Sequence, residues 1–395
     1  MHTNPKLCTK FRSLPLFLAA TAFVALVFAI QASAQHIEIF DVPGAGTSAG
    51  QGSNPWGISA QGTIVGWYVV GDYALHGFLR THQGDFTTFD ASGAGVDASQ
   101  GIFPVAINAK GEIVGAYLDA GFVFHGFLRT PKGEFIQTDD LLAGTNPGTG
   151  TRVVDINSAG SITGWSDDSF NTNHIFIRDA RRGTTEFYAP GAGKGDGQGT
   201  FMPTFYGINP AGAITGWYVD SNNVMHGYLR APDGTFTPFD APGAGTDSSV
   251  CAGAPAAPGA PPWLVGTQAG SLNPEGAVVG QYVDTNCVIH GFLRGADGSI
   301  TQFDAPGAGT GAGQGTSSVS NNPSGEVTGY YLDRSNVYHG FVRAKDGEFT
   351  TFDVLGAGTH AFQGTLPFGN TPAGVIGGYY VDANGAQHGF VRMPH

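Results

Sequence analysis

Charge, and basic charge above all, is scarce in this chain. Charged residues make up 12% of the 395 residues, and 18 Lys and Arg stand against 31 Asp and Glu, which gives a formal net charge of −13. Nucleic acids and anionic lipid surfaces are bound through clustered Lys and Arg, so we expect neither as a partner. Because acidic proteins repel their own copies, we expect a monomer.

Long apolar runs are missing after residue 34. The one such run, residues 14–30, follows a basic start and precedes the small-residue site Ala32-Ser33-Ala34, a pattern typical of a secretory signal peptide. We predict that residues 1–34 are a signal peptide and residues 35–395 a single secreted domain, extracellular or periplasmic, with no membrane insertion after cleavage. An uncleaved anchor helix is the alternative, because about 17 apolar residues is the lower limit for spanning a bilayer.

Familiar catalytic motifs are absent as well. The sequence holds no Gly-x-Ser-x-Gly, no His-Glu-x-x-His and no convincing pair of catalytic carboxylates. Its Pro-Gly-Ala-Gly segments lack the following helix and Lys of a phosphate-binding loop. We therefore predict no catalytic residue.

Cysteine is rare, with three in the whole chain. Cys8 lies in the predicted signal peptide, which leaves Cys251 and Cys287. Two cysteines in an exported chain favour one disulfide. Cys251 lies in a Pro-, Ala- and Gly-rich insertion at about residues 248–262, and we predict that a Cys251–Cys287 disulfide pins this loop.

Glycine, by contrast, is abundant: the chain has 63, while 41% of its residues are apolar. A His-Gly-Phe-like word that ends in Arg recurs seven times, at spacings of 49 to 64 residues. A nearly fixed period in this range indicates a repeat architecture. The histidines of the seven copies are His76, His125, His174, His226, His290, His339 and His388.

Each repeat predicts four short strands. In the fourth copy these are a weak first strand over residues 200–209, a second over 213–220, a third over 224–230 and a fourth over 235–240. The turn Asn209-Pro210-Ala211-Gly212 suits type I geometry, and a Gly-rich link follows the fourth strand. Four strands with a period near 50 are typical of a β-propeller blade; a β-helix, whose coils are shorter, is the alternative.

The chain ends predict how the ring closes. The last repeat stops after its third strand, while residues 36–41 match an orphan fourth strand at the start of the mature chain. Docked on the last repeat, this strand would complete a seventh blade and cover the exposed edges. We predict an all-β, seven-bladed β-propeller with four-stranded blades, closed by the N-terminal strand.

The second and third strands together read Gly-x-Tyr-x-Asp-x5-His-Gly-Phe-Leu-Arg. This pattern resembles the HAF repeat of bacterial exported proteins, and the resemblance covers all seven copies. Gly takes the place of the family's Ala in six copies and Ile175 does so in the third. The resemblance implies an extracellular, propeller-like protein without an established activity; the likeness to kelch and WD propellers is architectural only.

Seven histidines could suggest metal binding, but each lies in a different blade, too far from the others to share one ion. We predict that each His forms a hydrogen bond inside its own blade. The Asp six residues before most of them, such as Asp220, is expected to bond its own turn. We predict no cofactor and no metal; calcium at an oxygen-rich loop such as residues 220–223 is the alternative.

Two further repeated positions have structural interpretations. The Arg that ends each third strand, such as Arg230, is expected to pair with the Asp that ends the fourth, such as Asp240. Aromatics recur at one position of the second strand: Trp67, Trp165, Trp217 and Tyr330. Core packing is the default for these rings, and sugar stacking is the alternative.

Departures from the repeat point to function, because loops on a rigid scaffold often bind ligands. The third repeat differs most, with Ser166 in place of Tyr and an extra Asp167 beside Asp168, and the insertion before the fifth repeat ends near Trp263. We take these four as candidate ligand-binding residues.

Two functions remain open. The first is a non-catalytic binding or surface module with a glycan, peptide or cell-envelope partner. The second is a propeller hydrolase or lyase acting on a polysaccharide or lactone. The first strands should line the central channel and are poor in ionisable residues, with Arg152 and Asp155 as exceptions, which favours binding. Converging carboxylates or His at the channel mouth would favour an enzyme.

Overall fold

The computed structural model describes residues 36–169, 173–179, 183–195, 197–203, 206–251 and 264–394. The chain divides into two compact units, Met1–Ala34 and Gln35–His395, and the described residues belong to the second. The predicted signal peptide, most of the insertion before the fifth repeat and Trp263 lie outside the described residues.

The described residues form an all-β structure. They comprise 28 strands and one short 3₁₀ helix, η1 (Ser248–Cys251). None of the described segments is a helix with the length and apolar character needed to cross a membrane.

Each repeat contributes strands to four positions. The first strands are β2 (Gly52–Ile58), β6 (Gly101–Ile107), β10 (Gly150–Ile156), β14 (Gly199–Phe201), β18 (Gly266–Leu272), β22 (Gly315–Asn321) and β26 (Gly364–Asn370). The second strands are β3 (Ile64–Val69), β7 (Ile113–Leu118), β11 (Ile162–Asp167), β15 (Ile214–Val219), β19 (Val278–Val283), β23 (Val327–Leu332) and β27 (Ile376–Val381).

The outer positions follow the same order. The third strands are β4 (Leu75–Arg80), β8 (Phe124–Arg129), β12 (Asn173–Asp179), β16 (Met225–Arg230), β20 (Ile289–Arg294), β24 (Tyr338–Arg343) and β28 (Gln387–Arg392). The fourth strands are β5 (Phe86–Phe89), β9 (Phe135–Gln137), β13 (Gly183–Phe187), β17 (Phe236–Phe239), β21 (Ile300–Phe303), β25 (Phe349–Phe352) and β1 (Ile37–Phe40).

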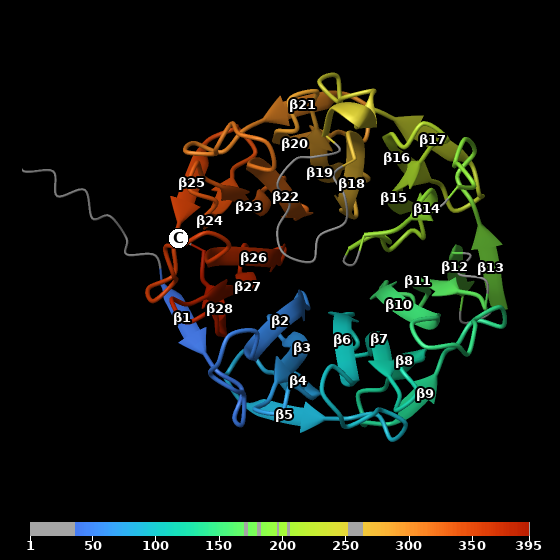
Figure 1. Cartoon of the computed structure of the whole chain (residues 1–395), viewed down its shortest axis with the longest axis vertical. Coiled ribbons are helices and arrows are strands. Elements are labelled where there is room, and N and C mark those ends of the chain that lie inside the picture. The colour runs from blue at the N-terminus through green and yellow to red at the C-terminus, as the bar shows by residue number, and fades with distance from the viewer. Residues whose placement is uncertain are drawn as a thin grey trace, which may run out of the picture. The chain divides into compact units, whose positions relative to one another are not determined.

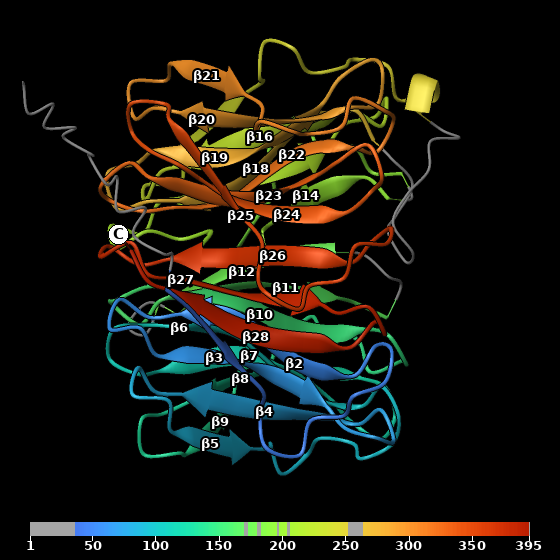
Figure 2. The ribbon, with the colours of Figure 1, turned by 90° about the vertical axis from the view of Figure 1, so that its left-hand side faces the viewer.

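Strands within a repeat pair antiparallel with their sequence neighbours, as β2, β3, β4 and β5 do. The resulting sheets are set around a central opening with their first strands innermost (Figures 1 and 2). This repeated, radial arrangement of four-stranded antiparallel sheets is a β-propeller architecture.

Neighbouring repeats join through a glycine. Gly101, which begins β6, pairs in parallel with Leu75, which begins the third strand of the preceding repeat. Its φ is 125°, and a Cβ there would overlap the Leu75 carbonyl oxygen. Only glycine accepts both the conformation and the contact, so the link between repeats depends on it.

The first and last strands of the described chain lie together. β1 pairs antiparallel with β28, with Ile37 opposite Arg392 and Phe40 opposite Gly389. The fourth strand beside the last repeat therefore comes from the opposite end of the domain.

Large apolar side chains fill the space between neighbouring sheets. The third strands each bury one aromatic ring almost completely: Phe78, Phe127, Phe176, Tyr228, Phe292, Phe341 and Phe390. Burying a side chain of this size contributes about 1.5–3 kcal/mol. The core is thus divided into a series of similar clusters, one at each boundary between sheets.

The Arg that ends the third strand does not pair with the fourth-strand Asp, so that expectation is wrong. In six repeats its guanidinium instead lies over a fourth-strand Phe of the neighbouring sheet, 4.5–5.1 Å from the ring centroid, as Arg294 does over Phe239. The Asp is taken by the His of its own sheet, because His and Asp face each other across the third and fourth strands. The Arg thus connects two repeats rather than one.

Asparagines in the turns between first and second strands connect repeats a second time. The Nδ2 of Asn108 donates to the Asn157 carbonyl (3.1 Å), and the Nδ2 of Asn157 donates to the Asn209 carbonyl (3.2 Å). Asn273 donates in the same way to Asn322, which donates to Thr371. We call this end of the propeller the turn face, and the opposite end, with the Gly-rich links, the link face.

Candidate functional site

The seven repeated histidines are engaged within the fold. In six repeats Nδ1 lies 2.7–3.0 Å from the carboxylate at the end of the fourth strand, as His226 does with Asp240. In five of these, Nε2 lies 3.5–3.7 Å from the Asp of the turn between second and third strands. The ring also stacks on a second-strand Tyr, as His226 does on Tyr218 at 5.0 Å.

This arrangement shifts the pKa values of its members. The hydrogen bond that the His290 ring donates to the Asp304 carboxylate raises the pKa of His290 against the opposing effect of burial. Burial raises the pKa of Asp220, but hydrogen bonds from the amides of Val224 and Asn222 outweigh it and lower the pKa overall. Among the described residues, no group of three or more His, Cys, Asp or Glu is placed to hold a metal ion.

The candidate residues of the third repeat are used internally. The Ser166 hydroxyl is buried and donates to the Asp140 carboxylate at 2.6 Å. Asp167 forms an ion pair with Arg152, with 2.6 Å between the carboxylate oxygen and the guanidinium nitrogen. The Arg152 guanidinium also lies over the Phe124 ring, 3.6 Å from its centroid. Asp168 lies 3.4 Å from Nε2 of His174. None of these three candidates lines the cavity described next.

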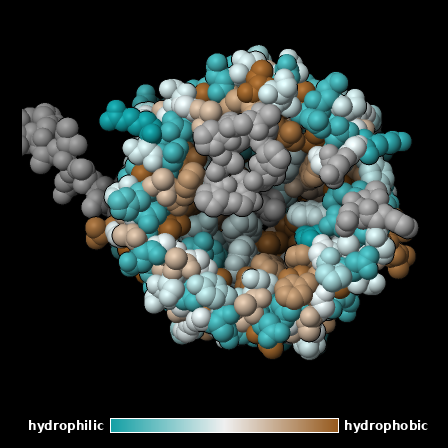
Figure 3. All heavy atoms as spheres, in the orientation of Figure 1, coloured by the Kyte–Doolittle hydropathy of each residue, from teal (hydrophilic) through white to brown (hydrophobic). Residues whose placement is uncertain are grey.

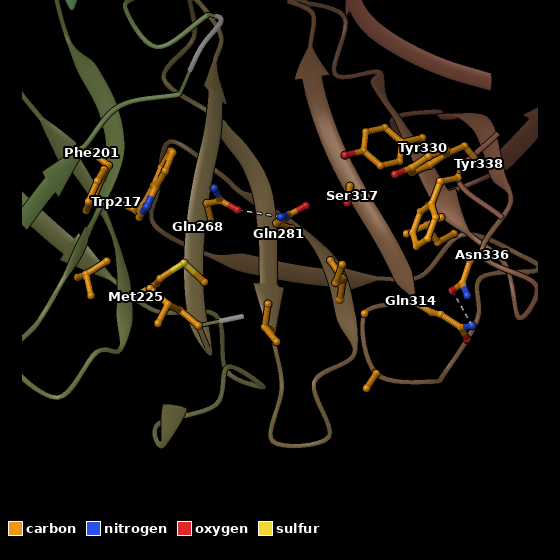
Figure 4. Close-up of a pocket in the computed structure, with 18 of the residues that line it drawn as sticks. Phe201, Trp217, Met225, Gln268, Gln281, Gln314, Ser317, Tyr330, Asn336 and Tyr338 are labelled. Carbon is orange, nitrogen blue, oxygen red and sulfur yellow. Dashed lines mark hydrogen bonds between the residues drawn. The ribbon is translucent and has the colours of Figure 1, made fainter. Parts of the chain in front are cut away.

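A cavity of about 640 Å³ opens at the link face, between the fourth, fifth and sixth repeats. Figure 3 looks onto this face, which is hollowed near its centre. In the close-up, Phe201 and Trp217 form one side of the cavity and Tyr330 and Tyr338 the other (Figure 4). The Phe201 and Trp217 rings are nearly parallel with centroids 5.9 Å apart, and the two tyrosines meet edge to face at 5.4 Å.

Amides lie between the two aromatic sides. Gln268 of β18 and Gln281 of β19 stand opposite each other in register, and Gln281 Nε2 donates to Gln268 Oε1 at 2.8 Å (Figure 4). Near the mouth, Gln314 Nε2 donates to Asn336 Oδ1 at 3.0 Å. Burial raises the pKa of Tyr330, so its hydroxyl is neutral at physiological pH. The cavity therefore offers aromatic faces and neutral hydrogen-bonding groups.

The predicted cysteine pair supports the aliphatic wall of this cavity. The sulfurs of Cys251 and Cys287 are 2.07 Å apart and their Cα atoms 5.6 Å apart, a disulfide geometry. Both cysteines are buried in one apolar cluster with Met225 and Ile289, which line the cavity. The bond ties η1 to the turn between β19 and β20, directly behind that wall.

Small or flexible inner residues of the fifth repeat leave this side of the channel open. β2 and β26 carry Trp56 and Phe368 at matching inner positions, and these rings pack 4.7 Å apart and fill their side of the channel. The matching residue of β18 is Gly270. At the second-strand position where the first, third and fourth repeats have Trp, the fifth has Gln281.

Sequence reasoning missed most of these residues. It selected the positions of Trp217 and Tyr330 but favoured core packing over ligand contact for them. Gln268 and Gln281 were not selected, although the loss of an aromatic residue at position 281 was a detectable signal. The cavity lies where a polar residue interrupts an aromatic series, and the third-repeat candidates lie outside it.

A second cavity of about 290 Å³ continues from the first. The two share Trp217, Gln268 and Gln281, and the second is otherwise lined by small or apolar residues that include Ala269, Gly270 and Ser318. The glutamine pair and Trp217 therefore form a neck between an upper and a lower cavity.

No protein-family model matches the chain, and no curated protein matches its sequence. Several solved structures are similar in shape. The lectin BP39L from Burkholderia pseudomallei is 10% identical, covers 87% of this chain and 98% of its own, and has a TM-score of 0.48. AofleA from Arthrobotrys oligospora is 14% identical, with 81% and 90% covered and a TM-score of 0.43. A PL25 ulvan lyase is 10% identical, with 88% and 97% covered and a TM-score of 0.45.

Proposed function

We propose that this protein is a non-catalytic binding module, a closed seven-bladed propeller that holds a neutral glycan in the upper cavity. The observation that carries the proposal is the placement of amide groups between two aromatic sides, in a cavity whose described lining residues carry no charge. A sugar ring presents apolar C–H faces and a hydroxyl edge, so it matches aromatic faces and amides together. Small-molecule sites in general combine apolar walls with a few convergent polar groups.

Seven closed blades are supported by the pairing of β1 with β28 and by seven sets of four strands in the described residues. The Arg–Phe stacks and the asparagine bonds recur at successive boundaries, so the repeated His, Arg and Asn residues serve the scaffold. Such a rigid scaffold keeps the cavity open at little cost in conformational entropy on binding.

Chemistry favours binding over catalysis at this place. The described residues that line the upper cavity include no Asp, Glu, His, Lys or Arg. A glycoside hydrolase needs two carboxyl groups, and a lyase needs a base within reach of the proton it removes. Arg152 and Asp167 neutralise each other in the third repeat, and Asp155 is fully buried against backbone amides.

A glycan array tests the proposal, with an array of peptides as the competing ligand class. Neutral oligosaccharides should give the signal, and Trp217→Ala should weaken it at least tenfold, about 1.4 kcal/mol, because one aromatic face is lost. Tyr73→Ala removes an aromatic that is 44% exposed and outside the cavity, and should leave binding unchanged. Binding to peptides alone, or equal loss in both variants, would refute the glycan assignment.

We also propose that residues 1–34 direct export and that the chain belongs with the HAF-repeat proteins. The basic start, the apolar run and the Ala32-Ser33-Ala34 site support export, and the His-Gly-Phe series supports the family. N-terminal sequencing of the mature protein should begin at Gln35, and an intact N-terminus would contradict the cleavage site. A thermal-shift comparison with calcium and with chelator tests the remaining calcium hypothesis, and we expect equal melting temperatures.

A further inference from the structure

We propose that the two cavities form one blind well that takes the end of a neutral sugar chain and not its middle. The inference rests on the proposed function and adds to it the part of the glycan that is recognised. It depends on three observations: the order of the cavities along the channel, the chemistry of the neck, and a side chain that closes the channel below.

The cavities follow one another along two neighbouring strands. Along β18, Gln268 lines both the upper and the lower cavity, and Gly270 lines the lower cavity alone. The next residues along the chain, 271–274, line a third cavity at the turn face. On β22, Ser317 lines the upper cavity and Ser318 the lower one, and residues 320–323 line the third. A ligand that enters at the link face therefore meets the upper cavity, the neck and the lower cavity in that order.

The neck has a defined hydrogen-bonding pattern. The bond between Gln281 Nε2 and Gln268 Oε1 leaves Gln268 Nε2 as a donor and Gln281 Oε1 as an acceptor, and no other hydrogen bond among the described residues involves these two atoms. An amide nitrogen carries two N–H donors and an amide oxygen two acceptor sites. A donor beside an acceptor matches two adjacent hydroxyls of a sugar ring. Trp217 lies at the same level and lines both cavities.

Tyr206 closes the channel between the lower cavity and the third one. Its carbonyl accepts a hydrogen bond from the Leu272 amide (2.8 Å), and its hydroxyl accepts one from the Ile58 amide (3.2 Å), in the first repeat. A Cβ on Gly369 of the seventh repeat would overlap the Tyr206 hydroxyl. Tyr206 of the fourth repeat thus contacts the fifth repeat through its backbone, and its side chain reaches the first and seventh repeats.

The closure follows from the short strand β14. The sequence predicts a strand over residues 200–209, but β14 ends at Phe201. The chain leaves the sheet after Phe201, whereas the other six first strands continue for seven residues. Tyr206 has a φ of 54°, and the chain returns at Ile208, whose amide bonds the buried Asp155 carboxylate at 3.0 Å.

The position of the closure decides which part of a chain can bind. A polymer that threaded the channel would have to pass Tyr206, and one that crossed the link face could not place an inner sugar below the neck. A terminal sugar can pass the neck, fill part of the lower cavity and leave the next sugar between Trp217 and Tyr330. The well therefore favours oligosaccharides with a free end.

The test prints each neutral oligosaccharide on the array in two orientations, through its reducing end and through its non-reducing end, together with cyclic oligosaccharides. Signal in one orientation only, with at least tenfold less on cyclic forms, is the expected result. Equal signal in both orientations and on cyclic forms overturns the well and leaves the proposed function standing. No signal on any neutral oligosaccharide overturns both.

A variant at the neck gives a second readout. Gln281→Trp introduces the residue that the first, third and fourth repeats have at this position, so we expect the variant to fold and the neck to be blocked. Binding of end-displayed oligosaccharides should fall at least tenfold, with the melting temperature within a few degrees of the parent. Trp165→Tyr, at the same position outside the cavity, is the control and should bind as the parent does. Full binding by a folded Gln281→Trp protein would overturn the well.

Discussion

Asp155 is an ionisable group held in the interior by the chain that closes the channel. Its Oδ1 accepts from the Ile156 amide at 2.8 Å, and its Oδ2 accepts from the Ile208 amide at 3.0 Å. Burial raises the pKa of this carboxyl from its ordinary 3.8 to about 6, because the loss of water outweighs the amide hydrogen bonds. The folded protein therefore binds a proton here more tightly than the unfolded chain does.

The sign and size of the effect on stability follow from this difference. Well below pH 3.8 the carboxyl is protonated in both states and does not change the free energy of unfolding. As the pH rises through 3.8 towards 6, the carboxyl ionises in the unfolded chain first, so folding becomes less favourable. A rise of roughly two pH units in pKa corresponds to about 3 kcal/mol of stability lost by pH 7.

Replacement of the carboxyl by an amide should remove this pH dependence. Between pH 4 and pH 7 the free energy of unfolding of the parent should fall by up to about 3 kcal/mol more than that of Asp155→Asn. Urea unfolding at several pH values from 4 to 7 measures it. Asp85→Asn, at an exposed position, corrects for the general charge effect. Parallel stability curves for parent and Asp155→Asn would refute the assignment of the perturbed group.

Three further changes test the scaffold. Replacing both Cys251 and Cys287 by Ser should cost about 4 kcal/mol by chain entropy for a separation of 36 residues, and an unchanged urea midpoint would mean that the bond does not form. NMR titration should show a pKa for His290 above 6.5, and Asp304→Asn should reverse this shift. Because the folded pKa is raised, the stabilisation by the protonated His290 is present below pH 6.5 and is lost as the pH rises through the folded pKa. Arg294→Lys should cost about 1 kcal/mol in chemical unfolding, because the stack on the neighbouring Phe is weakened.

The repeats made much of the fold predictable. The His-Gly-Phe word lies in the third strand of each sheet, and the turn at Asn209-Pro210 follows the predicted position. Each strand pattern is weak when taken alone, but the same pattern recurs in seven repeats, and this recurrence makes the strand assignment reliable. The predicted partners Cys251 and Cys287 come together because each lies in a loop of the link face in the same repeat.

The repeats also concealed part of the structure. Asp240 follows His226 by 14 residues, a spacing that recurs through the chain. Opposite charge makes Arg230 the expected partner of Asp240, but the two strands place His226 beside it instead. The cavity was missed for a different reason. It lies where Gln281 and Gly270 stand in place of the larger rings that other repeats carry, and this loss of size becomes visible only when the repeats are compared position by position.

The pairing of β1 with β28 affects how the protein folds. His388 bonds Asp41 across 347 residues, and joining segments this far apart costs about 5 kcal/mol in loop-closure entropy. During synthesis β1 emerges before the other strands of the propeller, so its edge stays unpaired until β28 has been made. That interval is when a strand edge invites aggregation. In a circular permutant that makes β1 continuous with β28, the two strands can pair as soon as both are made. We expect this permutant to refold with less aggregation than the parent at the same protein concentration.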